Sequence, residues 1–271
     1  GIYTIEATNE PKKVAVVGGG PAGMEAARVA ALRGHRVTLY EKDRKLGGLL
    51  NIATIPPHKE ELLNLKNYLS RQVEKNGVRV KLGEEFTLKT LERDKPDVVI
   101  VATGSVPLIP DIEGLENNNV VGFMDVLTGV KEIGDRVLVV GGGFVGCETA
   151  EFLRMKGKQV TILEMLPRVG HDIGVTNKFA TIIRLRTAGI EMKGNTKVIR
   201  ITEKGAESSR DGTTEFFAGD TVVLATGMMA NDKLAQQLEG KVGALYCIGD
   251  CVKPHRIEDA IESGFRIASQ I

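Results

Sequence analysis

Cysteine is scarce in this chain of 271 residues, which contains Cys147, Cys247 and Cys251. Three scattered cysteines are too few for the disulfide framework of a secreted domain and too few to ligate a four-cysteine iron–sulfur cluster. No apolar run approaches the roughly 18 residues that a membrane-spanning helix needs, and residues 1–10 lack the apolar core of a signal peptide. We therefore expect a cytoplasmic protein without a membrane partner.

An excess of charge of either sign is also missing. The 36 basic and 35 acidic residues leave a formal net charge of +1, so no strong field attracts nucleic acid or an anionic membrane. A hydrophobic content of 42% supplies the cores of one large or two ordinary domains. The expected partners are small molecules, and any phosphate among them has to be held locally by backbone.

What the chain does contain is a repeat. The sequence VAVVGGGPAG at residues 14–23 returns as VLVVGGGFVG at residues 137–146, which is 123 positions later (137 − 14). Self-similarity at one fixed offset indicates two copies of one structural unit. The same offset relates Gly34 to Gly157, Glu41 to Glu164, and residues 97–104 to residues 220–227.

Each copy has the pattern of a strand, a glycine turn, a helix and a second strand that ends in an acid. In the first copy, an unalternating β-branched run predicts a buried parallel strand over residues 12–17, and Pro21 begins the helix. A strand over residues 35–40 leads to Glu41, 23 residues after Gly18 (41 − 18). The second copy predicts strands over residues 136–140 and 159–163, a helix from Phe144 and the acid Glu164.

The remaining pattern predicts further elements around these two units. They are helices over residues 58–75 and 257–271, strands over residues 78–82, 97–102 and 245–248, and a three-stranded segment over residues 191–200, 201–206 and 215–217 with a turn at residues 210–212.

The chain crosses between the two units at residues 106–115, where Pro107, Pro110 and Gly114 favour a connection. After the second unit too little chain follows for a third domain, so the last strand and helix should rejoin the first unit. We expect an α/β fold of two Rossmann-like units, with the NAD unit inserted into the FAD unit. The FAD-binding domain would comprise residues 1–107 and 228–271, and the NAD(P)H-binding domain residues 108–227.

The chemistry follows from the glycines and acids. In such a motif the first glycine makes the tight turn, the second lets backbone approach a pyrophosphate, and the third brings the helix against the strand. Helix N-terminal N–H groups hold the anion, and the acid binds an adenosine ribose 2′-OH. Glu41 therefore fits FAD, and Glu164 favours NADH over NADPH, although Arg168 could reach a 2′-phosphate.

Gly249 and Asp250 follow a buried strand and precede the last helix. That arrangement can place a carboxylate on a ribityl chain and a helix N-terminus beneath a flavin ring, where it would stabilise the reduced flavin. An Asp-capped turn is the alternative interpretation.

These motifs together resemble the flavoprotein reductases with two dinucleotide folds. More narrowly, residues 18–27, Lys45-Leu-Gly-Gly48, Ile55-Pro-Pro57 and Gly146-Cys-Glu-Thr-Ala150 resemble the C-terminal half of 2,4-dienoyl-CoA reductase, enoate reductase and trimethylamine dehydrogenase. In that family a preceding barrel domain carries FMN, a 4Fe-4S cluster and the substrate site. The resemblance implies that this chain is a piece of a larger protein, in which it passes a hydride from NADH to FAD and electrons onward to the barrel.

The resemblance also implies the cofactor-binding residues. For FAD they are Gly18, Gly20, Pro21, Ala22, Gly23, Glu41, Lys42, Gly48, Leu49, Ala102, Thr103, Gly104, Gly249 and Asp250. For NADH they are Gly141, Gly143, Phe144, Val145, Gly146, Glu164 and Gly227. We expect no metal ligands and no catalytic side chain, because a flavin needs position and electrostatics rather than a nucleophile.

Two other functions stay open. A redox-silent module would hold ADP in the first unit, as the matching half of trimethylamine dehydrogenase does. A stand-alone NADH oxidase or electron-carrier reductase would use a partner protein in place of the barrel. Cys247 and Cys251 flank Asp250 and could form a redox pair, but buried packing is the expected role of such cysteines, and His58 and His255 are expected to be solvated.

Overall fold

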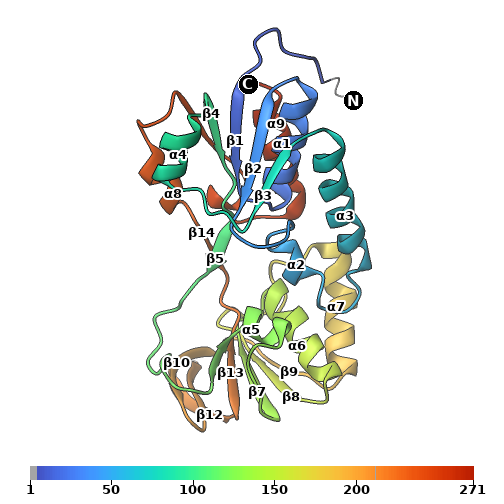
Figure 1. Cartoon of the computed structure of the whole chain (residues 1–271). Helices are drawn as coiled ribbons and strands as arrows, with labels where there is room; N and C mark the ends of the chain where they lie inside the picture. Colours follow the sequence, from blue (N-terminus) through green and yellow to red (C-terminus); the bar gives the residue numbers. More distant parts are fainter. Residues whose placement is uncertain (1–4, 211) are drawn as a thin grey trace. The chain divides into compact units, whose positions relative to one another are not determined.

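Two units, each built on its own five-stranded parallel sheet, make up the chain in a computed structural model that describes residues 5–210 and 212–271 (Figure 1). The first unit combines the residues up to Thr54 with Lys59–Val106 and Met228–Ile271. The second consists of Pro107–Gly227 together with the short segment Ile55–His58. The second unit is thus an insertion in the sequence of the first.

The first unit contains a parallel sheet with helices on both faces. Its strands are β1 (Lys13–Val17), β2 (Arg36–Glu41), β3 (Arg79–Leu82), β4 (Val98–Val101) and β15 (Ala244–Cys247), in the order β15-β4-β1-β2-β3. Its helices are α1 (Pro21–Leu32), α2 (Leu50–Ala53), α3 (Glu60–Lys75), α4 (Leu88–Asp94), α8 (Lys233–Leu238), the 3-10 helix η1 (Gly249–Cys251) and α9 (Ile257–Ala268).

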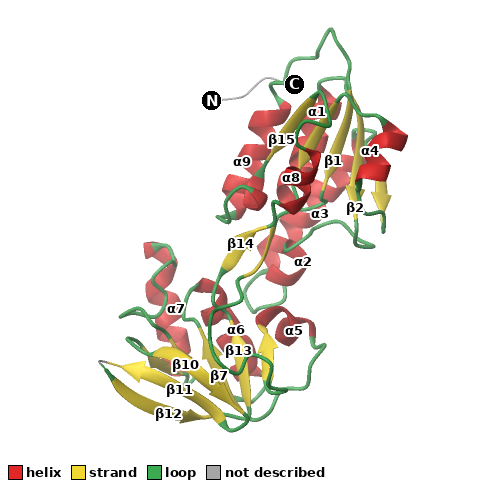
Figure 2. Ribbon diagram, turned by 90° about the vertical axis from the view of Figure 1, so that its left-hand side faces the viewer, coloured by secondary structure: helices red, strands yellow, loops and turns green. Residues whose placement is uncertain are grey.

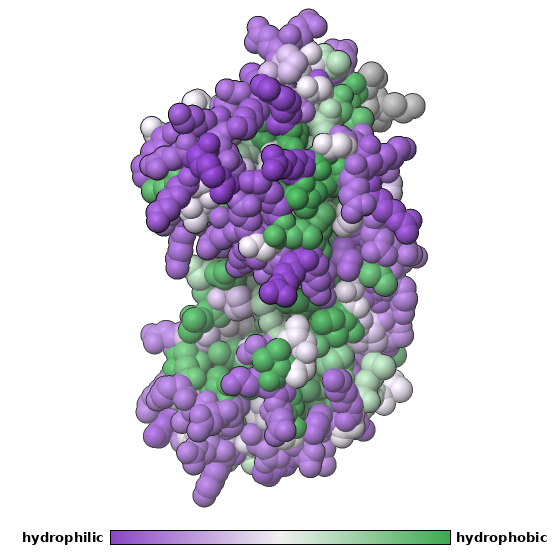
Figure 3. All heavy atoms as spheres, in the orientation of Figure 1, coloured by the Kyte–Doolittle hydropathy of each residue, from purple (hydrophilic) through white to green (hydrophobic). Residues whose placement is uncertain are grey.

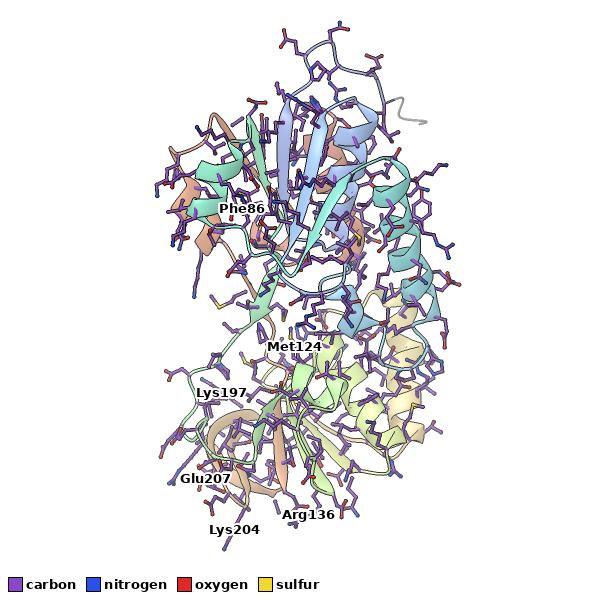
Figure 4. All side chains as sticks on the ribbon, viewed as in Figure 1. Phe86, Met124, Arg136, Lys197, Lys204 and Glu207 are labelled. Atoms are coloured by element: carbon purple, nitrogen blue, oxygen red, sulfur yellow. The ribbon has the colours of Figure 1, made fainter. Side chains whose placement is uncertain are left out.

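Alternate residues of β1 supply the two cores of this unit. Val14 and Val16 pack with α1, α3 and α9, whereas Ala15 and Val17 pack with α4 and α8 on the opposite face. On that second face Phe86, labelled in Figure 4, meets the ring of Tyr40 edge-on with 4.9 Å between centroids. Apolar residues on both faces are what an unalternating β-branched strand predicts for a buried parallel sheet.

The second unit repeats the parallel sheet and covers one face differently. Its strands are β6 (Val120–Gly122), β7 (Arg136–Val140), β8 (Gln159–Leu163), β9 (Glu191–Lys193) and β13 (Thr221–Leu224), in the order β6-β13-β7-β8-β9. A second, antiparallel sheet consists of β10 (Lys197–Thr202), β11 (Gly205–Arg210) and β12 (Thr213–Ala218). The helices are α5 (Phe123–Thr128), α6 (Phe144–Met155) and α7 (Val175–Thr187).

The antiparallel sheet lies over the parallel one, as Figure 2 shows for β10, β11 and β12. Val198, Ile201 and Ala206 meet Leu138 and Val140 of β7 in one buried cluster. Figure 4 labels Lys197 of β10, Glu207 of β11 and, in the turn between these strands, Lys204. By the repeat, Leu138 and Val140 are equivalent to Ala15 and Val17, so the antiparallel sheet covers the face that α4 and α8 cover in the first unit.

The prediction of one strand over residues 191–200 was wrong. The chain turns at Gly194 and Asn195, where Asn195 adopts a φ of +52°, so β9 joins the parallel sheet and β10 begins the antiparallel one. The predicted boundary at residue 201 falls inside β10. The predicted turn at residues 210–212 includes Asp211, which lies outside the described residues.

The last helix is shorter than predicted and the two glycine units are as predicted. α9 ends at Ala268 rather than residue 271. Strands β7 and β8 have the predicted bounds, and β1, β2 and β15 agree within one residue. Helices α2, α4, α5, α7 and α8 were not predicted. Four of them span at most seven residues, and the fifth, α7, buries only Thr181 and Leu185.

An aspartate links neighbouring strands in the same way in both sheets. Asp97 Oδ2 accepts a hydrogen bond from Lys13 N at 2.7 Å, and Asp220 Oδ2 accepts one from Arg136 N at 2.9 Å. The Arg136 guanidinium (Figure 4) also lies 2.6 Å from Asp220 Oδ1 and lowers the pKa of that carboxyl to about 2. The repeat therefore extends to the ends of the strands.

Two segments that connect the units pair with each other. Strands β5 (Ser105–Pro107) and β14 (Met228–Ala230) form a two-stranded sheet, flanked by bonds from Leu108 N to Gly227 O and from Asn231 N to Gly104 O. Gly104 and Gly227 both have positive φ, at +69° and +110°, where the chain leaves each parallel sheet.

Hydrophilic side chains cover most of the face drawn in Figure 3. None of the helices in residues 5–210 and 212–271 combines the length and apolar character needed to cross a bilayer.

We expect Gly264→Ala to lower the free energy of unfolding by about 1–3 kcal/mol, the usual cost of overpacking. A Cβ at Gly264 of α9 would lie 2.4 Å from the carbonyl oxygen of Ala22 in α1, and this backbone atom cannot turn aside. Urea denaturation followed by circular dichroism measures the change. Glu262→Ala creates the same residue at an exposed position of α9 and is the control. Equal stabilities for the two variants would mean that α1 and α9 separate freely.

Candidate dinucleotide-binding sites

The first glycine turn connects β1 to α1 and leaves space at its centre. Gly18 has a φ of +110°, and a Cβ there would lie 2.2 Å from the Ala102 carbonyl oxygen. A Cβ at Gly23 would lie 1.9 Å from the carbonyl oxygen of Gly18. At Gly20, in contrast, a Cβ would meet no atom of the described residues within 4 Å. The outer two glycines permit close packing, and the middle one borders open space.

That open space lies at the N-terminus of α1. Gly20 is the N-cap residue and Pro21 occupies the first helical position, so neither supplies a side-chain hydrogen bond to the first turn. Gly48, with a φ of +51°, borders the same space, since its Cβ would lie 3.1 Å from the Cα of Gly20. A helix N-terminus with free space at a glycine fits a pyrophosphate.

Glu41 ends β2 and braces the turn. Its buried carboxylate accepts hydrogen bonds from Gly19 N at 2.7 Å and from Asp43 N at 2.9 Å. Each bond uses one oxygen, and a carboxylate offers about four acceptor positions in all, so capacity remains for ribose hydroxyls. Lys42, which follows, is exposed. The remaining acceptor capacity of the Glu41 carboxylate fits the hydroxyls of an adenosine ribose.

The second turn has the same backbone geometry. Gly141 has a φ of +104°, and its Cβ would lie 2.3 Å from the Ala225 carbonyl oxygen. A Cβ at Gly146 would lie 1.9 Å from the carbonyl oxygen of Gly141. Glu164, buried at the end of β8, accepts from Gly142 N at 2.6 Å and from Leu166 N at 2.7 Å. The glycines and the acid of this turn also fit a dinucleotide.

One side chain distinguishes the second turn. The Asp172 carboxylate accepts a hydrogen bond from Phe144 N at 2.8 Å, at the N-terminus of α6. A Cβ at Gly143 would lie 2.9 Å from Asp172 Oδ2, so the carboxylate fills the position that is open at Gly20. Sequence reasoning missed Asp172. The repeat offset was the available signal, because it pairs Asp172 with Leu49, a predicted FAD residue (172 − 123).

The two Ala-Thr-Gly segments hold the connecting strands. The Thr103 hydroxyl donates to the carbonyl oxygen of Asn231 at 2.7 Å, and the Thr226 hydroxyl donates to that of Leu108 at 2.9 Å. The two bonds are equivalent under the repeat, since 103 + 123 = 226 and 108 + 123 = 231. Thr103 therefore has a structural partner within its own unit, beside the role that the sequence predicts for it.

Gly249 and Asp250 lie beside the first glycine turn. Gly249 has a φ of +66°, and its Cβ would lie 2.9 Å from Cβ of Ala22 in the first turn of α1. The Asp250 carboxylate accepts from the Ser105 hydroxyl and from His255 N, both at 3.2 Å. This packing brings Asp250 to the same end of the sheet as Gly20 and Glu41.

The two histidines named in the sequence analysis are both exposed. His255 is exposed and its ring contacts Asp259, whose carboxylate also accepts from Arg256 N at 3.1 Å as a cap of α9. His58 lines a cavity of about 690 Å³ together with residues from the C-terminal half of α6 and from α7. Since the glycine turn lies at the other end of α6, this cavity is separate from the candidate dinucleotide site. Across residues 5–210 and 212–271, no cluster of three or more His, Cys, Asp or Glu side chains could hold a metal ion.

Comparison with known proteins gives consistent matches over nearly the whole chain. A model of the family described as pyridine nucleotide-disulphide oxidoreductase matches residues 12–264. An NADH oxidase of Thermoanaerobacter brockii is 40% identical over 278 residues, which cover 100% of this chain and 43% of that protein. A cinnamate reductase of Clostridium sporogenes is 35% identical over 272 residues, covering 99% of this chain and 41% of the relative. The solved structure of 2-naphthoyl-CoA reductase with 2-naphthoyl-CoA superposes with a TM-score of 0.95 at 34% identity, covering 99% of this chain and 41% of that one.

The chain belongs to the pyridine nucleotide-disulphide oxidoreductase family. It is a flavin-dependent NAD(P)H oxidoreductase module with the α/β fold predicted from its repeat. The resemblance to the C-terminal half of the multidomain flavoprotein reductases is confirmed by these relatives. The chain spans less than half the length of each of them.

The three cysteines of this pyridine nucleotide-disulphide oxidoreductase are free thiols. Burial raises the pKa of Cys147 to about 12 and also raises the pKa of Cys251, whose sulfur contacts the carbonyl oxygens of Val101 and Ile248. Cys247 is exposed. Because the thiolate is the reactive form, the two buried thiols, Cys147 and Cys251, each lack the character of a redox cysteine.

We expect a thiol-specific disulfide reagent at pH 8.5 to label Cys247 quickly in the folded protein. Cys147 and Cys251 should react only in denaturant, because burial withholds both access and the thiolate form. Absorbance of the released thiolate counts the reactive groups. Cys247→Ser should remove the fast phase and leave the slow one. Rapid labelling of two thiols in the folded wild type would restore a redox pair at Cys247 and Cys251.

Proposed function

We propose that this chain is the NADH-dependent flavin reductase module of a larger enzyme. It would pass a hydride from NADH to FAD, and electrons would continue to an iron–sulfur and FMN barrel domain outside this sequence. The observation that carries the proposal is the pair of glycine turns, each with close glycine contacts and a buried acid that braces the turn. Two such sites in one chain suit transfer between two nucleotide cofactors.

In this proposal the residues 1–107 and 228–271 form the FAD domain and residues 108–227 the NADH domain. FAD would occupy the open space at Gly20 and contact the carboxylates of Glu41 and Asp250. NADH would contact the turn at Gly143 and the carboxylate of Glu164. The other predicted residues keep their assigned cofactors.

Bound FAD supplies the chemistry of accepting a hydride and releasing electrons singly. The protein contributes position and charge. The N-termini of α1 and α6 would present N–H groups to the phosphates, and α9 begins close after Asp250, where its N-terminus would favour negative charge. Ser105 and the amide of His255 hold the Asp250 carboxylate in place.

The sizes and names of the relatives support a companion domain. This chain covers 43% of the NADH oxidase and 41% of the cinnamate reductase, so each relative contains a further segment longer than this chain. Cinnamate is a 2-enoate, and reduction of its double bond is the reaction class of an enoate reductase. An NADH oxidase is the second candidate, favoured by the name of the 40% identical relative, although that relative too is longer than this chain.

We expect the chain reconstituted with FAD to lose flavin absorbance on anaerobic titration with about one equivalent of NADH. Gly20→Val should fold, because its side chain enters open space, but should weaken FAD binding at least roughly tenfold by filling the pyrophosphate position. The visible spectrum and FAD titration measure both effects, and circular dichroism checks the fold. Bound flavin that never bleaches would contradict the reductase proposal. Fast reoxidation by oxygen alone would favour the oxidase.

We expect Glu164→Gln to reduce the preference for NADH over NADPH about five- to tenfold, because it removes a negative charge near a 2′-phosphate. The ratio of the two dissociation constants, from fluorescence titration of the chain, measures the preference. Glu41→Gln makes the same change at the equivalent position of the first unit and should leave the ratio unchanged. A preference for NADPH in the wild type would point to Arg168 as a phosphate ligand.

A further inference from the structure

The N-terminus of α6 already binds a negative charge of the protein itself. Asp172 Oδ1 accepts a hydrogen bond from Phe144 N at 2.8 Å, and Oδ2 lies where a Cβ on Gly143 would come within 2.9 Å. In the first unit the corresponding position at Gly20 is open to at least 4 Å among the described residues. The two turns thus share a backbone but differ in what stands at the helix start.

The repeat shows that the difference lies at equivalent positions. Gly47 N donates to Gly19 O at 2.8 Å, and Gly170 N donates to Gly142 O at 2.6 Å, so the two loops keep the 123-residue register. In that register Asp172 is equivalent to Leu49 (49 + 123), and Phe144 is equivalent to Pro21 (21 + 123). Pro21 has no N–H to donate, and the side chain of Leu49 has no acceptor. In the second unit the N–H of Phe144 donates to the carboxylate of Asp172.

The side chain of Asp172 can move away from the N-terminus of α6. The residue itself is exposed, whereas the next residue, Ile173, is buried at 6% of its surface and anchors the loop. A change of side-chain rotamer alone would move the carboxylate into solvent without unfolding the segment. An anion that binds at the N-terminus of α6 would be repelled by the Asp172 carboxylate and would displace it.

We propose that Asp172 is a resident competitor for the dinucleotide pyrophosphate and lowers the affinity of the second unit for NADH. This inference rests on the proposed function, because it takes the turn at Gly143 as the NADH site. The carboxylate stabilises the empty site by capping α6, and the same negative charge opposes a phosphate group at the same N–H. Binding therefore has to displace one anion for another.

The test is the dissociation constant for NADH, measured by fluorescence titration of the whole chain. Asp172→Leu installs the residue of the first unit, and Asp172→Asn removes only the charge. Both should bind NADH about three- to tenfold more tightly than the wild type, with a smaller difference at high salt. Asp135→Asn, an equal charge change at an exposed position of the second unit, should leave the constant unchanged.

Thermal melting separates competition from a purely structural cap. Without NADH, Asp172→Leu should melt below the wild type, because Phe144 N loses its acceptor. With saturating NADH its stabilisation should exceed that of the wild type. Unchanged or weaker NADH binding by both variants overturns the inference and leaves the proposed function standing. Failure of the wild type and of both variants to bind NADH overturns the proposed function as well, whereas binding by the variants alone supports the inference.

Discussion

Each unit depends on one close contact, between the third glycine of a turn and the carbonyl oxygen of the first. A Cβ on Gly23 or Gly146 would lie 1.9 Å from that oxygen, so any side chain at either position would push the helix away from the sheet. The contact fixes where α1 and α6 begin, which is directly beyond β1 and β7. From that point the N–H groups of the helix can only face the carboxyl end of the sheet, where ligands of open α/β sheets bind.

The buried acids follow from the same constraint. Glu41 and Glu164 are taken out of water and bond two backbone N–H groups each, one in the glycine turn and one in the loop after the strand. A buried carboxylate is tolerated when charge-assisted hydrogen bonds replace its hydration. Each acid thereby tethers two loops and retains acceptor capacity beyond these two bonds. The residue that we propose to bind a ribose is also the residue that shapes the turn.

The sequence predicted the strands and helices that belong to the repeated motif, and it missed features that only the second unit has. β7 and β8 had the predicted bounds because glycines and acids delimit strands that are buried on both faces. The break between β9 and β10 was missed because Asn195 in a left-handed conformation leaves no pattern in an otherwise strand-like run. Asp172 was missed because an aspartate in a loop has no motif, and its role depends on a contact with Phe144 across 28 residues.

The two copies differ in whether a side chain of the protein occupies the start of the helix. At the first turn Pro21 has no N–H and the Leu49 side chain has no charge, so the position that Asp172 fills in the second turn stays open at Gly20. At the second turn Phe144 keeps its N–H, and Asp172 occupies it. If the first unit holds FAD and the second NADH, as we propose, then the cofactor that stays bound has the site without a competitor. The cofactor that must leave after each turnover has the site whose empty state the protein stabilises itself.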